Sequence, residues 1–214
     1  MIRRLALPAA LAIGAGALWA RKNPSACPYS QRWMIDIPHP LITRARLREA
    51  LEPKPGERVL EIGPGTGYYT GEIAEWVGPD GTVEIFDIQQ EMLDHTMERM
   101  GERGIANVTP TQGDARELPY DDDSVDAVVL ITVLGEIPDQ DAAFRELARV
   151  LKPGGRLVVG ELMGDPHYVS LSKMRLRAAG AGLEFEDRSG NALGFFALFS
   201  KPGGTEEEGL AGAA

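Results

Sequence analysis

The sequence predicts an α/β fold: a mostly parallel sheet of about seven strands with a reversed last strand and helices on both faces. Short apolar runs rich in Val, Ile and Leu alternate with amphipathic segments from residue 58 onward. Strands that alternate with helices in this way form a parallel sheet through right-handed crossovers. The last two apolar runs, 183–188 and 195–200, are separated by a short segment that allows only a turn, so these two strands must run antiparallel.

The strands are expected where β-branched and aliphatic residues gather. The run VDAVVLIT at 125–132 predicts a strand buried on both faces, as is typical of parallel sheets. Shorter runs such as RVLEI at 58–62 end at glycine-rich or polar segments that terminate a strand. In chain order the expected strands are 58–62, 82–87, 108–111, 125–132, 156–162, 183–188 and 195–200, with a turn near Ser189-Gly190-Asn191 joining the last two.

Helices are expected between these strands, where apolar residues recur every three or four positions. The segment 89–100, for example, places four methionine and leucine side chains on one side and charged residues on the other. The expected helices are 68–77, 89–100, 141–150 and 169–179. Residues 52–202 therefore form the predicted α/β domain, and the small and acidic residues of 203–214 predict a disordered tail.

The charge of the chain is distributed unevenly. The 214 residues carry a formal net charge of -10, but residues 1–48 contain eight Lys and Arg and a single acidic residue, Asp36. A basic arm of charge +7 thus precedes a body of charge -17. Because an acidic body repels phosphate backbones, this distribution argues against a nucleic-acid partner.

An apolar run at the start of the arm predicts an N-terminal apolar helix. Leu5–Ala20 has no charged side chain and lies between Arg3-Arg4 and Arg21-Lys22. As a helix it would be about 24 Å long, slightly short of the roughly 30 Å hydrocarbon core of a bilayer. We expect residues 1–22 to be a membrane anchor, with the acidic body on the cytoplasmic side by the positive-inside rule. A cleaved signal peptide and a soluble or disordered extension are the alternatives.

Residues 23–51 are predicted to form a linker and an amphipathic helix. The proline-rich linker contains a short helix at Tyr29–Ile35, and Pro40–Leu51 has leucines at helical spacing with arginines between them. This basic helix could lie on an anionic membrane or pack on the body.

The single cysteine, Cys27, excludes an intramolecular disulfide. The three histidines are far apart in the sequence, so no metal site is expected.

A glycine-rich loop follows the first strand of the body. Glu61-Ile62 precedes the loop Gly63-Pro64-Gly65-Thr66-Gly67, where glycines let the chain turn sharply and let a ligand approach the backbone. The G-x-G-x-G spacing differs from the dinucleotide fingerprint G-x-G-x-x-G, whose third glycine would fall at Tyr68. This difference weakens the case for an NAD-dependent oxidoreductase.

Two aspartates follow the next strands. Asp87 ends the second strand, where an acid can accept both hydroxyl groups of a ribose. Asp114 follows the third strand, where it could accept a hydrogen bond from an exocyclic amine or serve as a turn residue or helix cap. Because ligands of such sheets bind beyond the carboxyl ends of the strands, these loops are expected to carry the function.

Four segments in order resemble the motifs of class I S-adenosylmethionine (SAM) dependent methyltransferases: VLEIGPGTGYYT, EIFDIQQEML, GDARELPYDDDSVDAVVL and LARVLKPGGRLVV. The small-molecule type that includes quinone-biosynthesis C-methyltransferases is the most similar. The resemblance spans about residues 53–201 and implies a Rossmann-like sheet with a reversed last strand, in agreement with the independent expectation above.

The resemblance also assigns SAM-binding roles to residues of this chain. It implies that the glycines of the loop line the methionine part of SAM, with Glu61 in the same motif. Asp87 would hold the ribose hydroxyls and Ile88 would pack on adenine. Asp114 would bond the adenine amine, Ala115 would contact the ring, and the backbone near Ile131 would contact the methionine amino group. The implied cofactor residues are Glu61, Gly63, Gly65, Gly67, Asp87, Ile88, Asp114, Ala115 and Ile131.

Glu136, in LGEIPD after the fourth expected strand, is the candidate catalytic base. Methyl transfer requires a base only if the acceptor must lose a proton. Relatives commonly place histidines or other polar residues in this loop, so the glutamate is a departure. The predicted function is methyl transfer from SAM to a small-molecule or lipid-like acceptor by a membrane-tethered enzyme. The alternatives are a non-catalytic SAM-binding scaffold at the membrane and an NAD-dependent oxidoreductase.

Overall fold

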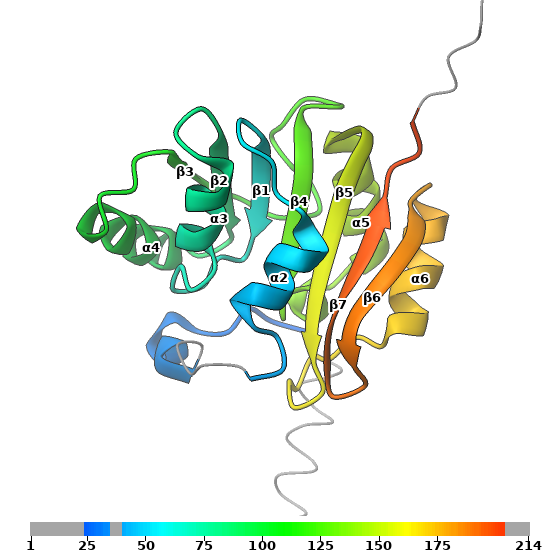
Figure 1. Cartoon of the computed structure of the whole chain (residues 1–214). Helices are drawn as coiled ribbons and strands as arrows, with labels where there is room; N and C mark the ends of the chain where they lie inside the picture. The colour runs from blue at the N-terminus through cyan, green and yellow to red at the C-terminus, as the bar shows by residue number, and fades with distance from the viewer. Residues whose placement is uncertain (1–23, 35–39, 204–214) are drawn as a thin grey trace, which may run out of the picture.

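Seven strands form one sheet in the order β3-β2-β1-β4-β5-β7-β6 in a computed structural model that describes residues 24–34 and 40–203 (Figure 1). β7 is antiparallel to both β5 and β6, and the other neighbouring strands are parallel. The mostly parallel sheet with a reversed last strand is therefore confirmed. The strands are β1 (Arg58–Ile62), β2 (Thr82–Asp87), β3 (Val108–Gln112), β4 (Val125–Ile131), β5 (Leu151–Leu162), β6 (Glu184–Asn191) and β7 (Gly194–Ser200).

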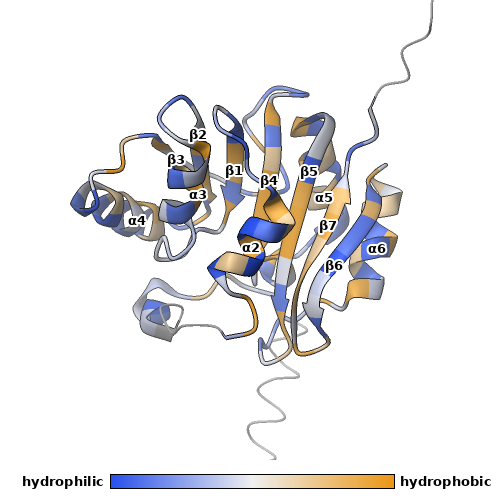
Figure 2. Cartoon of the chain, viewed as in Figure 1, coloured by the Kyte–Doolittle hydropathy of each residue, from blue (hydrophilic) through white to orange (hydrophobic). Residues whose placement is uncertain are grey.

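Helices cover both faces of the sheet, and each face has its own apolar core. On one face α2, α3 and α4 bury leucine, isoleucine and methionine side chains, and on the other α5 and α6 pack against the aromatic rings of β7. Figure 2 shows that the central strands are the most apolar part of the chain, as strands covered on both faces must be. The helices are η1 (Tyr29–Met34), α2 (Arg44–Leu51), α3 (Thr70–Val77), α4 (Gln90–Glu102), η2 (Leu134–Glu136), α5 (Gln140–Val150) and α6 (Leu171–Gly180), with η marking 3-10 turns.

Helix α2 packs on the body. Packing on the body was one of the two expectations for this segment, and the other was binding to an anionic membrane. Its side chains Leu47 and Leu51 are fully buried against the β5–β7 part of the sheet. The guanidinium of Arg156 on β5 fixes the end of the helix, because its Nε donates to the carbonyl of Leu51 at 2.9 Å and its Nη2 pairs with Glu57 at 2.7 Å. α2 thus joins the N-terminal segment to the sheet.

The two edge strands differ from the apolar centre. β3 contains Pro110, which has no N–H group to offer a further strand. β6 reads EFEDRSGN, and most of its side chains are exposed or half-buried. Figure 2 shows it as a largely hydrophilic strand at the rim of the sheet.

Several element boundaries differ from expectation. Ser189–Asn191 belongs to β6, and the chain reverses two residues later, where the side chain of Asn191 accepts a hydrogen bond from the backbone N–H of Leu193 at 2.9 Å. β5 begins at Leu151, five residues early, because the start of the strand already pairs with Val125 of β4. Helix α3 begins two residues later than expected, and the helix at 40–51 begins at Arg44, where Thr43 caps it.

The apolar helix predicted within 1–22 and all but the first residue of the tail predicted at 203–214 lie outside the described residues. Within 24–34 and 40–203, no helix combines the length and the apolar composition needed to cross a bilayer.

Candidate cofactor and acceptor site

The loops after β1, β2 and β3 are joined by backbone hydrogen bonds. The N–H of Gly63 donates to the carbonyl of Phe86 at 2.8 Å, and the N–H of Gly113 donates to the carbonyl of Asp87 at 3.0 Å. Three segments that the sequence singled out separately therefore meet at one edge of the sheet. This edge is the carboxyl edge, where β1 lies between β2 and β4 and the strand order reverses.

The glycine loop has a backbone that only glycine adopts without strain. Gly63, Gly65 and Gly67 have φ of +67°, +58° and +76°. Helix α4 holds the loop from outside: Thr96 Oγ1 donates to the carbonyl of Gly65 at 3.0 Å, and Arg99 Nη1 donates to that of Thr66 at 3.1 Å. The loop is thus fixed before any ligand binds.

Glu61 lies in β1, directly below the glycine loop, and is almost completely buried. The hydroxyl of Thr70, the first residue of α3, donates to its Oε2 at 2.6 Å. Burial raises the pKa of Glu61 to about 7, and the charge of Glu72 adds to the rise, whereas the Thr70 hydrogen bond opposes it. A cation bound at this end of β1 would favour the ionised form.

Asp87 ends β2 beside the glycine loop, with 9% of its surface exposed. Burial raises the pKa of its carboxyl group, which the backbone N–H groups of Ile88 and Gln89 counteract; the bond from Gln89 measures 2.8 Å. The side chain of Ile88 is 55% exposed next to it. A buried acid beside an exposed apolar side chain suits a ligand that has both hydroxyl groups and a flat ring.

Asp114 follows β3 and already has a partner. Arg116 binds its carboxylate with Nη2 at 2.6 Å and Nε at 2.9 Å, and this guanidinium lowers the pKa of Asp114. An adenine amine at Asp114 would have to share the carboxylate with Arg116. Ala115 beside it is buried in the apolar core.

The end of β4 lies against the glycine loop. A Cβ atom at Gly63 would come within 2.4 Å of a methyl group of Val133, so the two loops are in close contact. Between them, Thr132 has φ of +55°, an uncommon value for a β-branched residue, while its N–H donates to the carbonyl of Gly160 at 2.9 Å. Strain of this kind is found at ligand sites. Ile131, the last residue of β4, is half-buried at this point.

Glu136 in η2 is a further titratable group of the edge. Burial raises its pKa to about 8, opposed by a hydrogen bond from the backbone of Cys27, and the charges of Asp165 and Asp87 raise it further. The N-terminal segment 24–34 crosses this edge: the carbonyl of Cys27 also accepts from the Gln89 side chain at 2.9 Å. The segment therefore connects the loop after β2 with the loop after β4.

Glu161 is a site residue that sequence reasoning missed. It lies near the end of β5, and only 1% of its surface is exposed. Its Oε2 accepts from the backbone N–H of Val169 at 3.3 Å, and its Oε1 has no hydrogen-bond partner. Burial raises its pKa to about 8, and the charges of Asp165 and Glu136 contribute. The only signal in the sequence is a single acid inside the apolar run VVGEL, a pattern that predicts a strand and no more.

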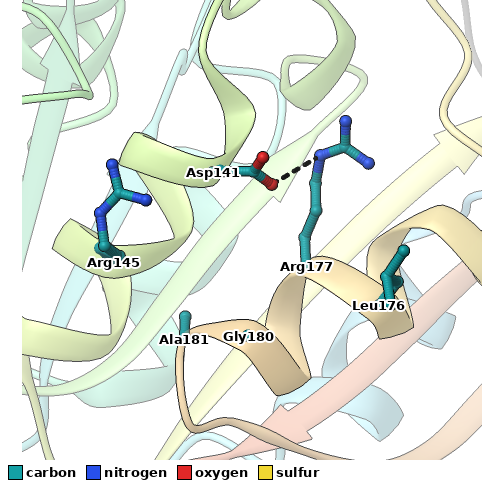
Figure 3. Close-up of a pocket in the computed structure, with 6 residues that line it drawn as sticks. All are labelled: Asp141, Arg145, Leu176, Arg177, Gly180 and Ala181. Atoms are coloured by element: carbon teal, nitrogen blue, oxygen red, sulfur yellow. Dashed lines mark ion pairs between the residues drawn. The ribbon is translucent and has the colours of Figure 1, made fainter.

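An open groove between α5 and α6 lies elsewhere on the molecule (Figure 3). Asp141 of α5 and Arg177 of α6 form an ion pair across it at 3.2 Å, and Arg145 and the exposed Leu176 line its sides. None of the residues lining this groove belongs to the loops described above. The carboxyl edge is therefore the candidate site for cofactor and acceptor binding.

The sheet order, the glycine loop and the acid after β2 define the fold class of SAM-dependent methyltransferases. A SAM-dependent methyltransferase from Aquifex aeolicus has the same fold, with a TM-score of 0.75 and 22% identity over 82% of this chain and all of that chain. The profile of the ubiE/COQ5 methyltransferase family matches residues 37–173, and the chain belongs to that family.

One curated relative and one further solved structure show how far the similarity extends. The ubiquinone/menaquinone biosynthesis C-methyltransferase UbiE of Vibrio parahaemolyticus is 40% identical over 122 residues, 56% of this chain and 47% of that protein. The chain thus matches about half the length of such curated relatives. The [4+2]-cyclase SpnF has the same fold, with a TM-score of 0.67 and 22% identity over 75% of this chain and 80% of that chain.

The residues at the carboxyl edge fit SAM, the cofactor of this class. SAM has a net positive charge, because its sulfonium and ammonium groups outnumber its single carboxylate, and the edge offers the carboxyl groups of Glu61 and Asp87, whose burial makes a cationic partner favourable. A dinucleotide would instead bring two phosphate charges to the same carboxyl groups. The chemistry of this donor set therefore favours SAM over NAD.

Gly63→Ala is expected to weaken SAM binding and to lower the free energy of unfolding by about 1–3 kcal/mol, because it combines left-handed strain with overpacking. The added Cβ would also push Val133 out of place. Calorimetric titration with SAM and urea unfolding measure the two effects. Gly164→Ala is the matched control, since its Cβ would meet nothing within 4 Å. Wild-type affinity in Gly63→Ala would contradict the role of the loop.

Proposed function

We propose that this protein transfers a methyl group from SAM to a ring carbon of a small or lipid-like quinone precursor. The observation that supports this most is the junction of the glycine loop with Asp87 and the loop after β4 at the carboxyl edge, in a member of the ubiE/COQ5 methyltransferase family. Its relatives are C-methyltransferases of ubiquinone and menaquinone biosynthesis, which suggests the acceptor class.

Bound SAM would supply an already activated methyl group, so the protein's task is binding and alignment. In this proposal Asp87 accepts the ribose hydroxyls and Ile88 covers the adenine ring. The glycine loop lets the methionine part approach the backbone, with Ile131 on the opposite side. The segment 24–34, which is bonded to Gln89 after β2 and through the backbone of Cys27 to Glu136 after β4, excludes water from the edge.

The fold alone does not decide the reaction, since a [4+2]-cyclase shares it. A scaffold that binds SAM without turnover would keep the cofactor residues and lack a working acceptor side. The half-buried Glu136 and the buried Glu161 favour an enzyme, because raised pKa values in a site are typical of acid–base chemistry.

Incubation of the protein with methyl-labelled SAM and cell extract is expected to label the lipid or small-molecule fraction. Asp87→Asn should raise the Kd for SAM about 10–100-fold, because a hydrogen bond to a charged group contributes about 1.5–3 kcal/mol. Asp187→Asn on the exposed edge strand is the control and should bind as wild type. Binding of SAM with no labelled fraction would favour the scaffold, and absence of SAM binding would refute the proposal.

Glu136 is proposed as the base that removes a proton from the acceptor. Glu136→Gln should lower kcat about 10²–10⁴-fold while the Kd for SAM stays within about twofold. The base must be ionised and its pKa is raised to about 8, so the wild-type rate should rise with pH up to about that value. Initial rates from pH 6 to 9 measure this, with Glu184→Gln on β6 as the control. Unchanged turnover in Glu136→Gln would remove it from the mechanism.

The proposal also includes a tether formed by residues 1–22, on the strength of the apolar run Leu5–Ala20 and its flanking basic residues. The full chain should sediment with membranes, and a chain lacking residues 1–22 should stay in the supernatant. Recovery of the intact full chain in the supernatant would contradict the tether without affecting methyl transfer.

A further inference from the structure

We propose that Glu161 is a second acceptor-contacting residue, which donates a hydrogen bond from Oε1 to an oxygen atom on the acceptor ring and stabilises the negative charge that develops there. The inference rests on the proposed function, because it assigns Glu161 a role toward the acceptor of the same reaction. It identifies the acceptor as a ring that carries a hydroxyl group.

Glu161 lies at the carboxyl edge on the β5 side of β4, and the glycine loop lies on the β1 side. The β5 side is therefore the side proposed for the acceptor. In the parallel register of β4 and β5, Ile131 pairs with Gly160, so Glu161 is one residue further toward the carboxyl edge on the neighbouring strand. Its carboxyl group lies close enough to Glu136 for the charge of Glu136 to raise the pKa of Glu161. Glu136, the proposed base, follows β4 along the chain, and Glu161 belongs to the neighbouring strand β5.

The hydrogen bonding of Glu161 determines where its proton lies. Oε2 accepts from the N–H of Val169 at 3.3 Å, which leaves Oε1 as the oxygen that holds the proton in the neutral form. Oε1 is buried and has no partner in the structure. A buried polar atom without a partner costs about 1–3 kcal/mol, and an arriving ligand that accepts its hydrogen bond recovers that cost.

The surroundings keep Glu161 neutral more readily than Glu136. The charges that act on it are those of Glu136 on η2 and Asp165 on the loop after β5, a loop that also contains His167 and Tyr168, while the β7 residue that pairs with it is the apolar Phe195. Glu161 is almost fully buried, whereas Glu136 is half-buried. When the pair holds one proton, it therefore stays on Glu161.

The two carboxyl groups then have different tasks in one proton transfer. The O–H bond of the acceptor hydroxyl breaks and its proton passes to the ionised Glu136, where a new O–H bond forms. The electron pair stays on the acceptor oxygen, and the neutral Glu161 donates its own hydrogen bond to that oxygen without giving up its proton. Two neighbouring acids whose surroundings separate their protonation states are an established way of combining base and donor.

The test uses 1-naphthol, a ring with one hydroxyl group, bound to the full chain together with S-adenosylhomocysteine. Ultraviolet absorbance reports the ionisation of bound naphthol independently of methyl transfer. We expect bound naphthol to ionise at lower pH than free naphthol in the wild type and in Glu161→Gln, whose amide N–H can still donate. Glu161→Leu should abolish the shift. The matched control is Glu84→Gln, which changes a buried carboxyl group of β2 that forms an ion pair with Arg58 of β1. This variant should behave as wild type.

Kinetics with methyl-labelled SAM and 1,4-dihydroxynaphthalene supply a second readout. Glu161→Leu should lower kcat about 10²–10³-fold, as loss of one donor to a developing oxyanion does. Glu161→Gln should stay within about tenfold of wild type and should lose the fall in rate above the pKa of Glu161, because an amide does not ionise.

Equal naphthol ionisation in wild type and Glu161→Leu, or no naphthol binding at all, would overturn the role of Glu161 whatever the methyl transfer shows. A Glu161→Gln variant as impaired as Glu161→Leu would also overturn it. Failure of the proposed function is distinguishable, since it appears as absent SAM binding or absent labelling of every extract fraction.

Discussion

The position of β1 between β2 and β4 is the constraint on which the site depends. The chain leaves β1 toward one side of the sheet and returns through β4 on the other, so the loops after these strands separate above β1 and leave room for a ligand. The glycine loop lies in that space, bonded to Phe86 on one side and in contact with Val133 on the other. The residues proposed to touch SAM lie in this glycine loop, at the end of β2 or at the end of β4.

Burial of carboxyl groups is the second determinant, and it depends on the first. Because β1 and β5 are covered on both faces, Glu61 and Glu161 near their carboxyl ends are removed from water, and the half-buried Glu136 of η2 is partly so, which raises the pKa of all three. Removing a charge from water is costly, so burial favours the neutral form of an acid and a bound cation favours its ionised form. The sulfonium cofactor is a cation for Glu61, and the acceptor oxygen is a hydrogen-bond partner for the neutral Glu161, so the same burial serves both proposed ligands.

The fold was largely predictable because its strands are apolar and its loops are marked by glycine and aspartate. β1 and β2 begin and end at the expected residues, since charged or glycine-rich segments flank them. The hairpin turn was misplaced because Gly190, a typical turn residue, lies inside β6, where the backbone of β7 passes too close for a side chain. The glycine loop and Asp87 could be located from spacing alone. Glu161 could not, because an acid inside an apolar strand gains its meaning from burial and from its neighbours, and only three-dimensional structure provides these.

The edges of the sheet have a consequence for the behaviour of the protein in a crowded solution. An exposed strand edge is a template on which another chain can add a strand, and a sheet with such apolar central strands would aggregate by that route. Here Pro110 interrupts the row of N–H groups on β3, and the acidic and basic side chains of β6 make its edge unfavourable for an apolar strand. The protein can therefore keep a strongly hydrophobic sheet at high concentration without sheet-to-sheet polymerisation, which leaves the carboxyl edge as the part of the sheet that meets other molecules.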